Sequence, residues 1–266
     1  MQEIYNMHTH IFPEKISDKA VEAVGSFYGI KMQRKGTSKD LVEDGGKIGV
    51  TKYLVSSTAT KPSQVSSINH FISQAVKTNS EFIGFGSLHP KSENIEKDIE
   101  EILDLKLSGI KLHPDFQEFD LDDPITYNMF DLCQGKLPFL IHMGDNRYTY
   151  SQPWRLLSIL EKFPKLVVIA AHLGGYTMWT RLKTPYLSHP RIYMDTSSSL
   201  PFLSPEEAVY LIRKHGIAKV FFGTDYPMWD HVGEFERFMK LPLTDKEKEM
   251  ILCTNAKSFL LQCHNN

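Results

Sequence analysis

The chain has 266 residues, of which 41% are hydrophobic and 23% are charged, as in an ordinary globular protein. Its formal net charge is −2 and its acidic and basic residues are interspersed, which argues against a nucleic acid or an anionic membrane as partner. No apolar run approaches the ~20 residues of a membrane span, and the N-terminus lacks the regions of a signal peptide. We therefore expect a cytoplasmic protein in which Cys133, Cys253 and Cys263 are free thiols.

Eight short runs rich in apolar, β-branched or aromatic residues recur along the chain, and several are as continuously apolar as the strands of a buried parallel sheet. These predicted strands are Glu3–Met7, Lys52–Ser56, Phe82–Ser87, Gly109–Leu112, Phe139–His142, Leu166–His172, Ile192–Asp195 and Val220–Thr224.

Helix signals fill the intervals between these runs. A periodic stretch follows Pro62 and extends to about Thr78, and Ser92–Leu107 carries its isoleucines on one face. Start signals stand at Asp122-Asp123-Pro124 and at Ser204-Pro205, and a capping box begins at Thr244 before a last helix to about Gln262.

Alternation of eight strands with helices predicts an α/β fold, a single-domain (β/α)8 TIM barrel that spans residues 1–266. The alternative, a doubly wound open sheet, is disfavoured because no Gly-x-Gly-x-x-Gly follows the first strand. The first interval is the longest, so Phe12–Lys39 is expected to form an elaborated loop with a helix over the barrel mouth.

Polar residues gather where the predicted strands end. His8 and His10 stand at positions i and i+2 of one strand, which places two imidazoles on the same side. The later strands end in Lys111 and His113, His142, His172, Asp195 and Asp225. Because active sites of (β/α)8 barrels lie at the carboxyl ends of the strands, this pattern predicts a metal-dependent active site there.

The motifs His8-Thr9-His10, Gly109-Ile110-Lys111-Leu112-His113-Pro114 and Gly223-Thr224-Asp225-Tyr226-Pro227 resemble those of the amidohydrolase superfamily. The resemblance covers the whole chain and is to the amidohydrolase-related group that contains aminocarboxymuconate-semialdehyde decarboxylase. It implies that His8, His10, His142 and Asp225 bind one divalent metal, most often zinc. It also implies that His172 stands beside the metal, and that Asp225 and His172 act in catalysis.

Lys111, His113 and Arg147 are predicted to contact the substrate. In binuclear members of the superfamily a carbamylated lysine of strand 4 bridges two metals, but the group that this chain resembles normally works with one. Asp195 is placed to accept a hydrogen bond from a ligand histidine. Relatives often pair, so a homodimer is expected.

Two reactions remain open for such a site. The first is hydrolysis of a small ester, lactone or amide by a metal-activated water. The alternative is nonoxidative decarboxylation of a small carboxylated substrate, which needs cations to hold the carboxylate. Because lysines make up most of the 30 basic residues and arginine serves a carboxylate best, the sequence favours hydrolysis.

Two further functions have less support from the sequence. A TatD-type deoxyribonuclease shares the His-x-His opening, but such enzymes carry an acidic residue where this chain has Gly-Ile-Lys-Leu-His, and the chain lacks a basic excess. A non-enzymatic protein with a structural metal site would be expected to use cysteine ligands.

Overall fold

Eight parallel strands form the centre of the molecule in a computed structural model that describes residues 3–32 and 34–264. Each strand pairs with the next one along the chain, in the order β1 to β8. The strands are β1 (Ile4–His10), β2 (Val50–Ser56), β3 (Phe82–Ser87), β4 (Gly109–Leu112), β5 (Phe139–Ile141), β6 (Val168–Ala170), β7 (Ile192–Asp195) and β8 (Val220–Phe221).

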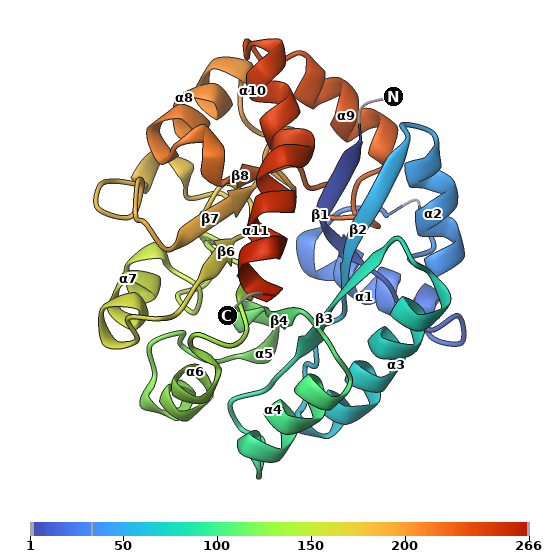
Figure 1. Ribbon diagram of the computed structural model, residues 1–266, viewed down its shortest axis with the longest axis vertical. Helices are drawn as coiled ribbons and strands as arrows, with labels where there is room; N and C mark the ends of the chain where they lie inside the picture. The colour runs from blue at the N-terminus through green and yellow to red at the C-terminus, as the bar shows by residue number, and fades with distance from the viewer. Residues whose placement is uncertain (1–2, 33, 265–266) are drawn as a thin grey trace.

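The sheet closes between its first and last strands. The backbone N–H of Met7 donates to the carbonyl of Phe222 at 2.8 Å, and Thr9 forms a parallel bridge with Tyr226. Helices alternate with the strands around the outside, except that the segment between β6 and β7 holds only the 3-10 turn Trp179–Arg181 (Figure 1). The fold is therefore the single-domain (β/α)8 barrel that the sequence predicts.

Several helical segments begin near their predicted start signals. Thr244 and Ser204 each cap a helix through a capping box, and Asp123 caps a 3-10 turn. The α-helices are α1 (Ser17–Tyr28), α2 (Ser38–Gly46), α3 (Val65–Thr78), α4 (Ile95–Asp104), α5 (Pro114–Gln117), α6 (Tyr127–Cys133), α7 (Pro153–Lys162), α8 (Pro205–His215), α9 (His231–Met239), α10 (Asp245–Glu249) and α11 (Asn255–His264). Short 3-10 turns occupy Pro62–Gln64, Pro124–Thr126, Trp179–Arg181 and Ile217–Lys219, and a π-helical turn, Met250–Thr254, joins α10 to α11.

Five strands differ from their predicted bounds. β2 begins two residues earlier, at Val50, and β5 ends one residue earlier, at Ile141, while β1, β6 and β8 differ more. β1 extends to His10, beyond the predicted end at Met7, so both histidines of the His-x-His motif lie inside the strand. β6 and β8 end earlier than predicted, before His172 and Asp225. These two residues adopt left-handed backbone conformations, with φ of 62° and 59°, which an extended strand does not contain.

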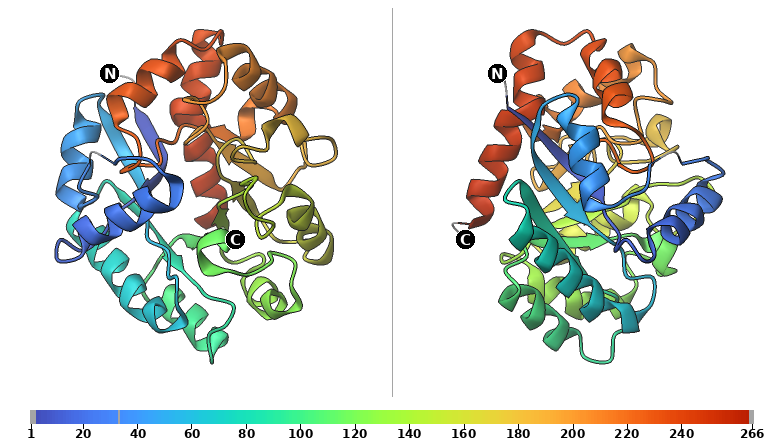
Figure 2. Two further views of the ribbon diagram at one scale, coloured as in Figure 1. Left: turned by 180° about the vertical axis from the view of Figure 1, so that it is seen from behind. Right: turned by 90° about the vertical axis from the view of Figure 1, so that its right-hand side faces the viewer.

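The barrel has different covers at its two ends. Phe259 and Ala256 of α11 pack with Tyr5, Met7 and Phe221, residues of the cluster inside the barrel. The helix α1 lies at the other end, and its Tyr28 contacts the ring of His142. Figure 2 shows α11 and α1 on opposite sides of the molecule. The long first interval therefore supplies the helix expected over the mouth.

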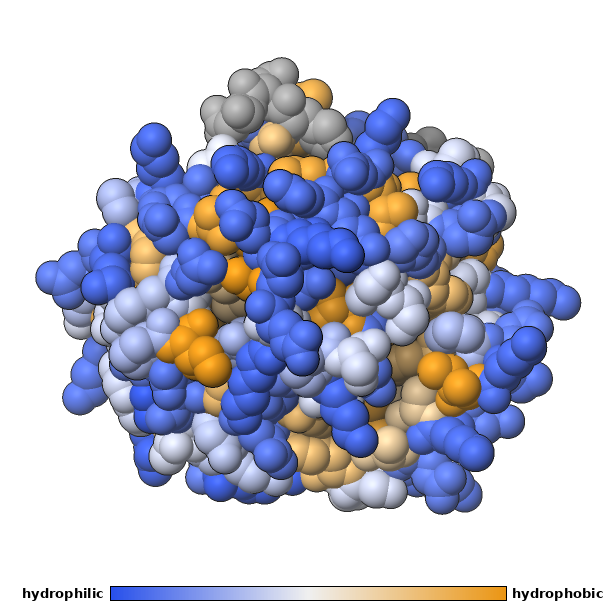
Figure 3. All heavy atoms as spheres, turned by 90° about the horizontal axis from the view of Figure 1, so that it is seen from below, coloured by the Kyte–Doolittle hydropathy of each residue, from blue (hydrophilic) through white to orange (hydrophobic). Residues whose placement is uncertain are grey.

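The lengths of the helices and the polarity of the surface bear on whether the chain could span a membrane. Among the described residues, no helix is long and apolar enough to cross a membrane. Hydrophilic residues cover most of the face seen in Figure 3, with hydrophobic residues in smaller areas between them. The three cysteines are free, as expected.

Candidate metal centre

His8, His10 and Asp225 form a compact group at the carboxyl end of the barrel. The Nε2 atoms of His8 and His10 lie 3.5 and 3.2 Å from Oδ1 of Asp225. The three ligand atoms all lie within 4.8 Å of one another, as one cation would require. The sequence prediction that these three residues converge is matched by their position.

A bulge in β1 explains how neighbouring side chains serve both the core and the site. The pairing of β1 with β2 shifts its register between Asn6 and Thr9. Such a shift re-aims side chains and increases the local twist of a strand. Met7 is therefore fully buried in the cluster inside the barrel, while the next residue, His8, turns its ring toward Asp225.

Hydrogen bonds fix which ring nitrogen of each histidine carries the proton. Nδ1 of His8 lies 3.0 Å from Oδ2 of Asp195, which only accepts, so this nitrogen donates and Nε2 keeps its lone pair. Nδ1 of His10 lies 3.2 Å from the hydroxyl of Ser56, which itself donates to the carbonyl of Thr9. Both histidines thus carry an unprotonated Nε2 beside Asp225, the form that a metal requires. In this structure Nε2 of His8 accepts from the ammonium of Lys111, 3.0 Å away.

His142 lies beside this group and not within it. The carbonyl of Ser197 accepts from Nδ1 of His172 at 3.1 Å, so Nε2 of His172 in turn accepts from Nδ1 of His142 at 2.9 Å. The remaining Nε2 of His142 is a buried lone pair without a hydrogen-bond partner among the described residues. This buried lone pair fits the ligand role predicted for His142.

The protonation states of these groups suit a cation. Burial lowers the pKa of His8 and of His10, and it lowers the pKa of His172 to about 4. Burial alone would raise the pKa of Asp225, but the histidines around it hold that pKa well below its usual value. The imidazoles are therefore neutral and the carboxylate is ionised at pH 7, the forms in which these residues bind metals.

His172 packs against His8, one of the predicted ligands. Its ring stacks on that of His8, with centroids 5.1 Å apart. Asp195, predicted to support a ligand histidine, does so through His8.

Lys111 brings a buried positive charge to the centre. Its Nζ lies 3.0 Å from Nε2 of His8, and its side chain is almost fully buried. Burial lowers the pKa of this ammonium group to about 8, so it is mostly protonated at pH 7. Lys111 can therefore offer a cation to a substrate anion.

His113 stacks on His142 with ring centroids 4.0 Å apart, and it bonds to Tyr28. Arg147 lies farther toward the rim, where its guanidinium pairs with Asp145 and donates to the carbonyl of Phe27. The contacts of His113 and Arg147 with a substrate stay predictions.

Four residues of this region were not found from the sequence. Asp115 shares a group with His113 and His142, and burial raises the pKa of its carboxyl group to about 7. Ser197, Ser198 and Tyr28 complete the set. The serines stand in a polar run after β7 that reads as an ordinary loop, and Tyr28 is far away along the chain. These residues are recognised only in the folded structure, where the serine run is buried and α1 lies against the mouth.

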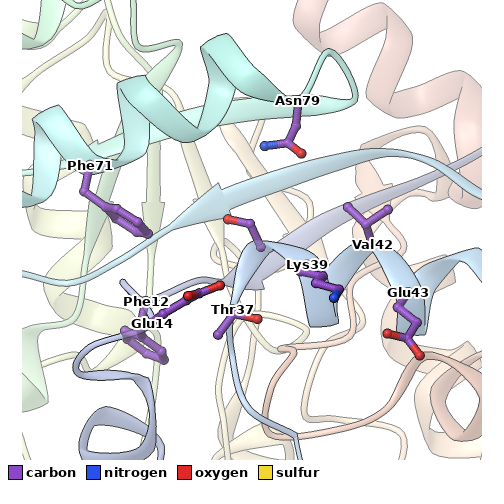
Figure 4. Close-up of a pocket in the computed structure, with 9 residues that line it drawn as sticks. Phe12, Glu14, Thr37, Lys39, Val42, Glu43, Phe71 and Asn79 are labelled. Carbon is purple, nitrogen blue, oxygen red and sulfur yellow. The ribbon is translucent and has the colours of Figure 1, made fainter.

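The pocket drawn in Figure 4 is separate from this centre. It lies on the outside of the barrel, between the loop after β1, the helix α2 and the helix α3. Its lining residues are Phe12, Glu14, Thr37, Ser38, Lys39, Val42, Glu43, Phe71 and Asn79. None of the predicted site residues is among them.

A family model described as amidohydrolase matches residues 5–261. The chain belongs to the amidohydrolase family. It is 29% identical over 238 residues to a 2-amino-3-carboxymuconate-6-semialdehyde decarboxylase of Dictyostelium discoideum, with 73% of this chain covered. The match spans 65% of that relative's length, somewhat less than two thirds.

Solved structures with the same fold include two decarboxylases. The 5-carboxyvanillate decarboxylase of Sphingomonas paucimobilis superposes with a TM-score of 0.77 at 16% identity, over 98% of this chain and 99% of that one. A dihydroxybenzoic acid decarboxylase of Polaromonas sp. JS666, crystallised with manganese and 2-nitroresorcinol, gives a TM-score of 0.70 at 15% identity, over 98% and 97%. At such identities these likenesses show the fold.

Proposed function

We propose that this protein is a metal-dependent decarboxylase that removes carbon dioxide, without oxidation, from a small carboxylated substrate. The observation that carries the proposal is the group of His8, His10 and Asp225, with neutral imidazoles and an ionised carboxylate, beside the buried cation of Lys111. The printed activities of the relative from Dictyostelium discoideum and of the two similar structures agree with this reaction.

Lys111 removes the main argument for a hydrolase. That argument was the scarcity of arginine, the residue that holds a carboxylate best. A lysine that is almost fully buried gives a stronger field than an exposed arginine, because few water molecules screen it. The hydrolysis of an ester, lactone or amide becomes the second candidate.

His8, His10 and Asp225, with His142 as the predicted fourth ligand, would hold one divalent cation. Zinc suits three imidazoles and a carboxylate, and manganese suits them too. Such a cation would supply Lewis-acid polarisation of a substrate oxygen.

The side chains around this centre have separate tasks in the proposed reaction. Nζ of Lys111 binds an anionic oxygen of the substrate. When the carbon–carbon bond to the carboxylate breaks, carbon dioxide leaves and the electron pair of that bond stays on the substrate carbon. This carbon must then take up a proton. Oδ1 of Asp225 is the atom that we propose to handle this proton. His172 would assist by orienting His142, whose Nδ1 donates to its Nε2. Phe27 and Tyr28 of α1 shield the mouth from water.

Product analysis tests the proposal. Protein loaded with zinc or with manganese is incubated with 2,6-dihydroxybenzoate, with 5-carboxyvanillate and with a panel of lactones. Release of carbon dioxide with formation of the decarboxylated product is expected, and it should disappear in Asp225→Asn. Lactone hydrolysis without any carbon dioxide would reject decarboxylation and restore the hydrolase. The oligomeric state of the same sample, from light scattering, tests the predicted homodimer.

A further inference from the structure

The C-terminal end of α1 is fastened to the mouth by contacts that do not involve the hydroxyl of Tyr28. Arg147 donates from a terminal guanidinium nitrogen to the carbonyl of Phe27 at 2.6 Å. Its guanidinium carbon lies 4.7 Å from the ring centroid of Phe27 and 5.3 Å from that of Tyr28, within the range of cation–π attraction. Tyr148 stacks on Phe27, with centroids 5.4 Å apart. The ring of Tyr28 is therefore held in place whether or not its hydroxyl is present.

Hydrogen bonds set the direction of that hydroxyl. The backbone N–H of Phe116 lies 3.2 Å from Nδ1 of His113, and because an N–H only donates, this nitrogen must accept. A neutral imidazole with an unprotonated Nδ1 carries its proton on Nε2. The Nε2–H of His113 therefore donates to the hydroxyl oxygen of Tyr28, 2.8 Å away.

The proton of the Tyr28 hydroxyl is left for another acceptor. Within residues 3–32 and 34–264, the bond with His113 is the only hydrogen bond of this hydroxyl. The hydroxyl stands beside the stacked rings of His113 and His142, and the ring of Tyr28 lies 6.3 Å from that of His142. A directed O–H donor without an acceptor among the described residues thus lies next to the candidate metal centre, at the end of the helix that covers the mouth.

We infer that Tyr28 is a substrate-binding residue, whose hydroxyl donates a hydrogen bond to an anionic oxygen of the bound carboxylate. The inference rests on the proposed function only in taking the ligand to be a carboxylate. A hydrogen bond from a hydroxyl to a charged oxygen is among the stronger ones in proteins. His113 would then act on the substrate through the tyrosine that it orients.

A comparison of two tyrosine-to-phenylalanine variants tests the inference. The probe is benzoate, a simple aromatic carboxylate, added to metal-loaded protein in a calorimeter. Tyr28→Phe keeps the ring but removes the donor, and should raise the dissociation constant of benzoate by about tenfold or more. Tyr148→Phe is the matched control. Its ring belongs to the same aromatic cluster, and its hydroxyl has no hydrogen-bond partner in the described part of the chain. This control should stay within about twofold of the wild type.

Two further measurements separate binding from structural damage. The metal content per chain and the melting temperature of Tyr28→Phe should equal those of the wild type, because the hydroxyl touches no predicted ligand. A dissociation constant within twofold of the wild type in Tyr28→Phe overturns the inference, and so does a wild type that binds no benzoate. If the wild type binds benzoate but releases no carbon dioxide from any carboxylate, the proposed function fails while the role of Tyr28 is still decided by the two variants.

Discussion

The hydroxyl of Ser198 donates a hydrogen bond to Oδ2 of Asp225 at 2.5 Å. Trp229 fixes the direction of this bond, because its indole N–H, which only donates, lies 2.9 Å from the same hydroxyl oxygen. The hydroxyl oxygen accepts from the indole, so its proton remains for the carboxylate. With Oδ2 bound in this way, Oδ1 of Asp225 is the oxygen that faces His8 and His10.

Removal of this support should weaken metal binding. Ser198→Ala is expected to raise the dissociation constant of the divalent metal by about tenfold, as loss of a partner of a metal ligand commonly does. Trp229→Phe should raise it by a smaller factor, because only the donor that orients the serine is lost. Competition with a chelating dye measures both constants.

A double-mutant cycle decides whether Trp229 acts on Asp225 through Ser198. Trp229→Phe should have no effect on metal affinity in the Ser198→Ala background, since there is then no hydroxyl to orient. Trp179→Phe serves as the control, because it deletes an indole N–H that donates to the carbonyl of His172 and not to the serine that supports Asp225. Additive effects of the two variants on metal affinity would contradict the hydrogen-bond sequence from Trp229 through Ser198 to Asp225.

The double variant His8→Ala, His10→Ala should bind no metal and keep its fold. Two of the four predicted ligands are lost at once, and the remaining Asp225 and His142 form only a weak site. Elemental analysis and circular dichroism measure the two properties, with the exposed His70→Ala as the control. Full metal content in the double variant would show that the ligands lie elsewhere.

Asp195→Asn should weaken metal binding by about ten- to a hundredfold. The carboxylate now accepts from Nδ1 of His8 and so keeps Nε2 unprotonated. An amide nitrogen presented to Nδ1 would favour the other tautomer, with its proton on the nitrogen that faces the metal. A titration of apo-protein with zinc gives the constant, and an unchanged value would speak against the assigned tautomer.

The buried His215 should make the protein less stable in mild acid. Burial lowers the pKa of His215 to about 4, below the ordinary value of 6.5, so the folded state holds the ring neutral while the unfolded state takes up a proton. Its contribution is complete above about pH 6.5 and is lost as the pH falls toward 4. From pH 7 to pH 5 the loss in unfolding free energy is about 2 kcal/mol.

Urea denaturation at the two pH values checks this contribution against the variant His215→Gln. Glutamine still donates to the carbonyl of Ile192, as the ring does at 3.0 Å, but it does not titrate. The variant should lose less stability between pH 7 and pH 5 than the wild type does. Equal losses would mean that His215 is not the group responsible.

Phe259→Ala should destabilise the barrel by roughly 3–5 kcal/mol, as for other large-to-small changes in a core. The ring is 2% exposed and packs against Tyr193 and Phe221. Leu261→Ala on the same helix is the control, since Leu261 is 65% exposed and its loss should cost less than about 0.5 kcal/mol. Equal midpoints of thermal unfolding in the two variants would contradict this account.

The barrel and the polar residues at its mouth were predictable because both follow from local patterns. Continuous apolar runs identify buried parallel strands, and the residue that ends such a run lies at the functional edge of the barrel. His8, His10 and Asp225 were found in this way. The contact of Asp195 with a ligand histidine was also expected, from its place at the end of β7.

Contacts between distant loops were not predictable from the sequence. Nothing in the run Thr196–Ser199 shows that Ser198 turns toward a carboxylate of another loop, with φ of 47°. The bulge that lets Met7 and His8 face different surroundings depends on pairing with β2, which local sequence does not reveal. Tyr28 reaches the mouth only because α1 folds back over it.

Because α11 and α1 lie at opposite ends of the barrel, α11 stabilises the fold while α1 borders the site. Substitutions that improve the packing of α11 should raise the melting temperature without disturbing the chemistry, because the site lies at the other end of the barrel. We expect substitutions in α1, at the mouth, to change which compounds the protein binds and to leave the packing of α11 unchanged. Evolution and protein engineers alike can therefore adjust robustness and selectivity as two independent traits.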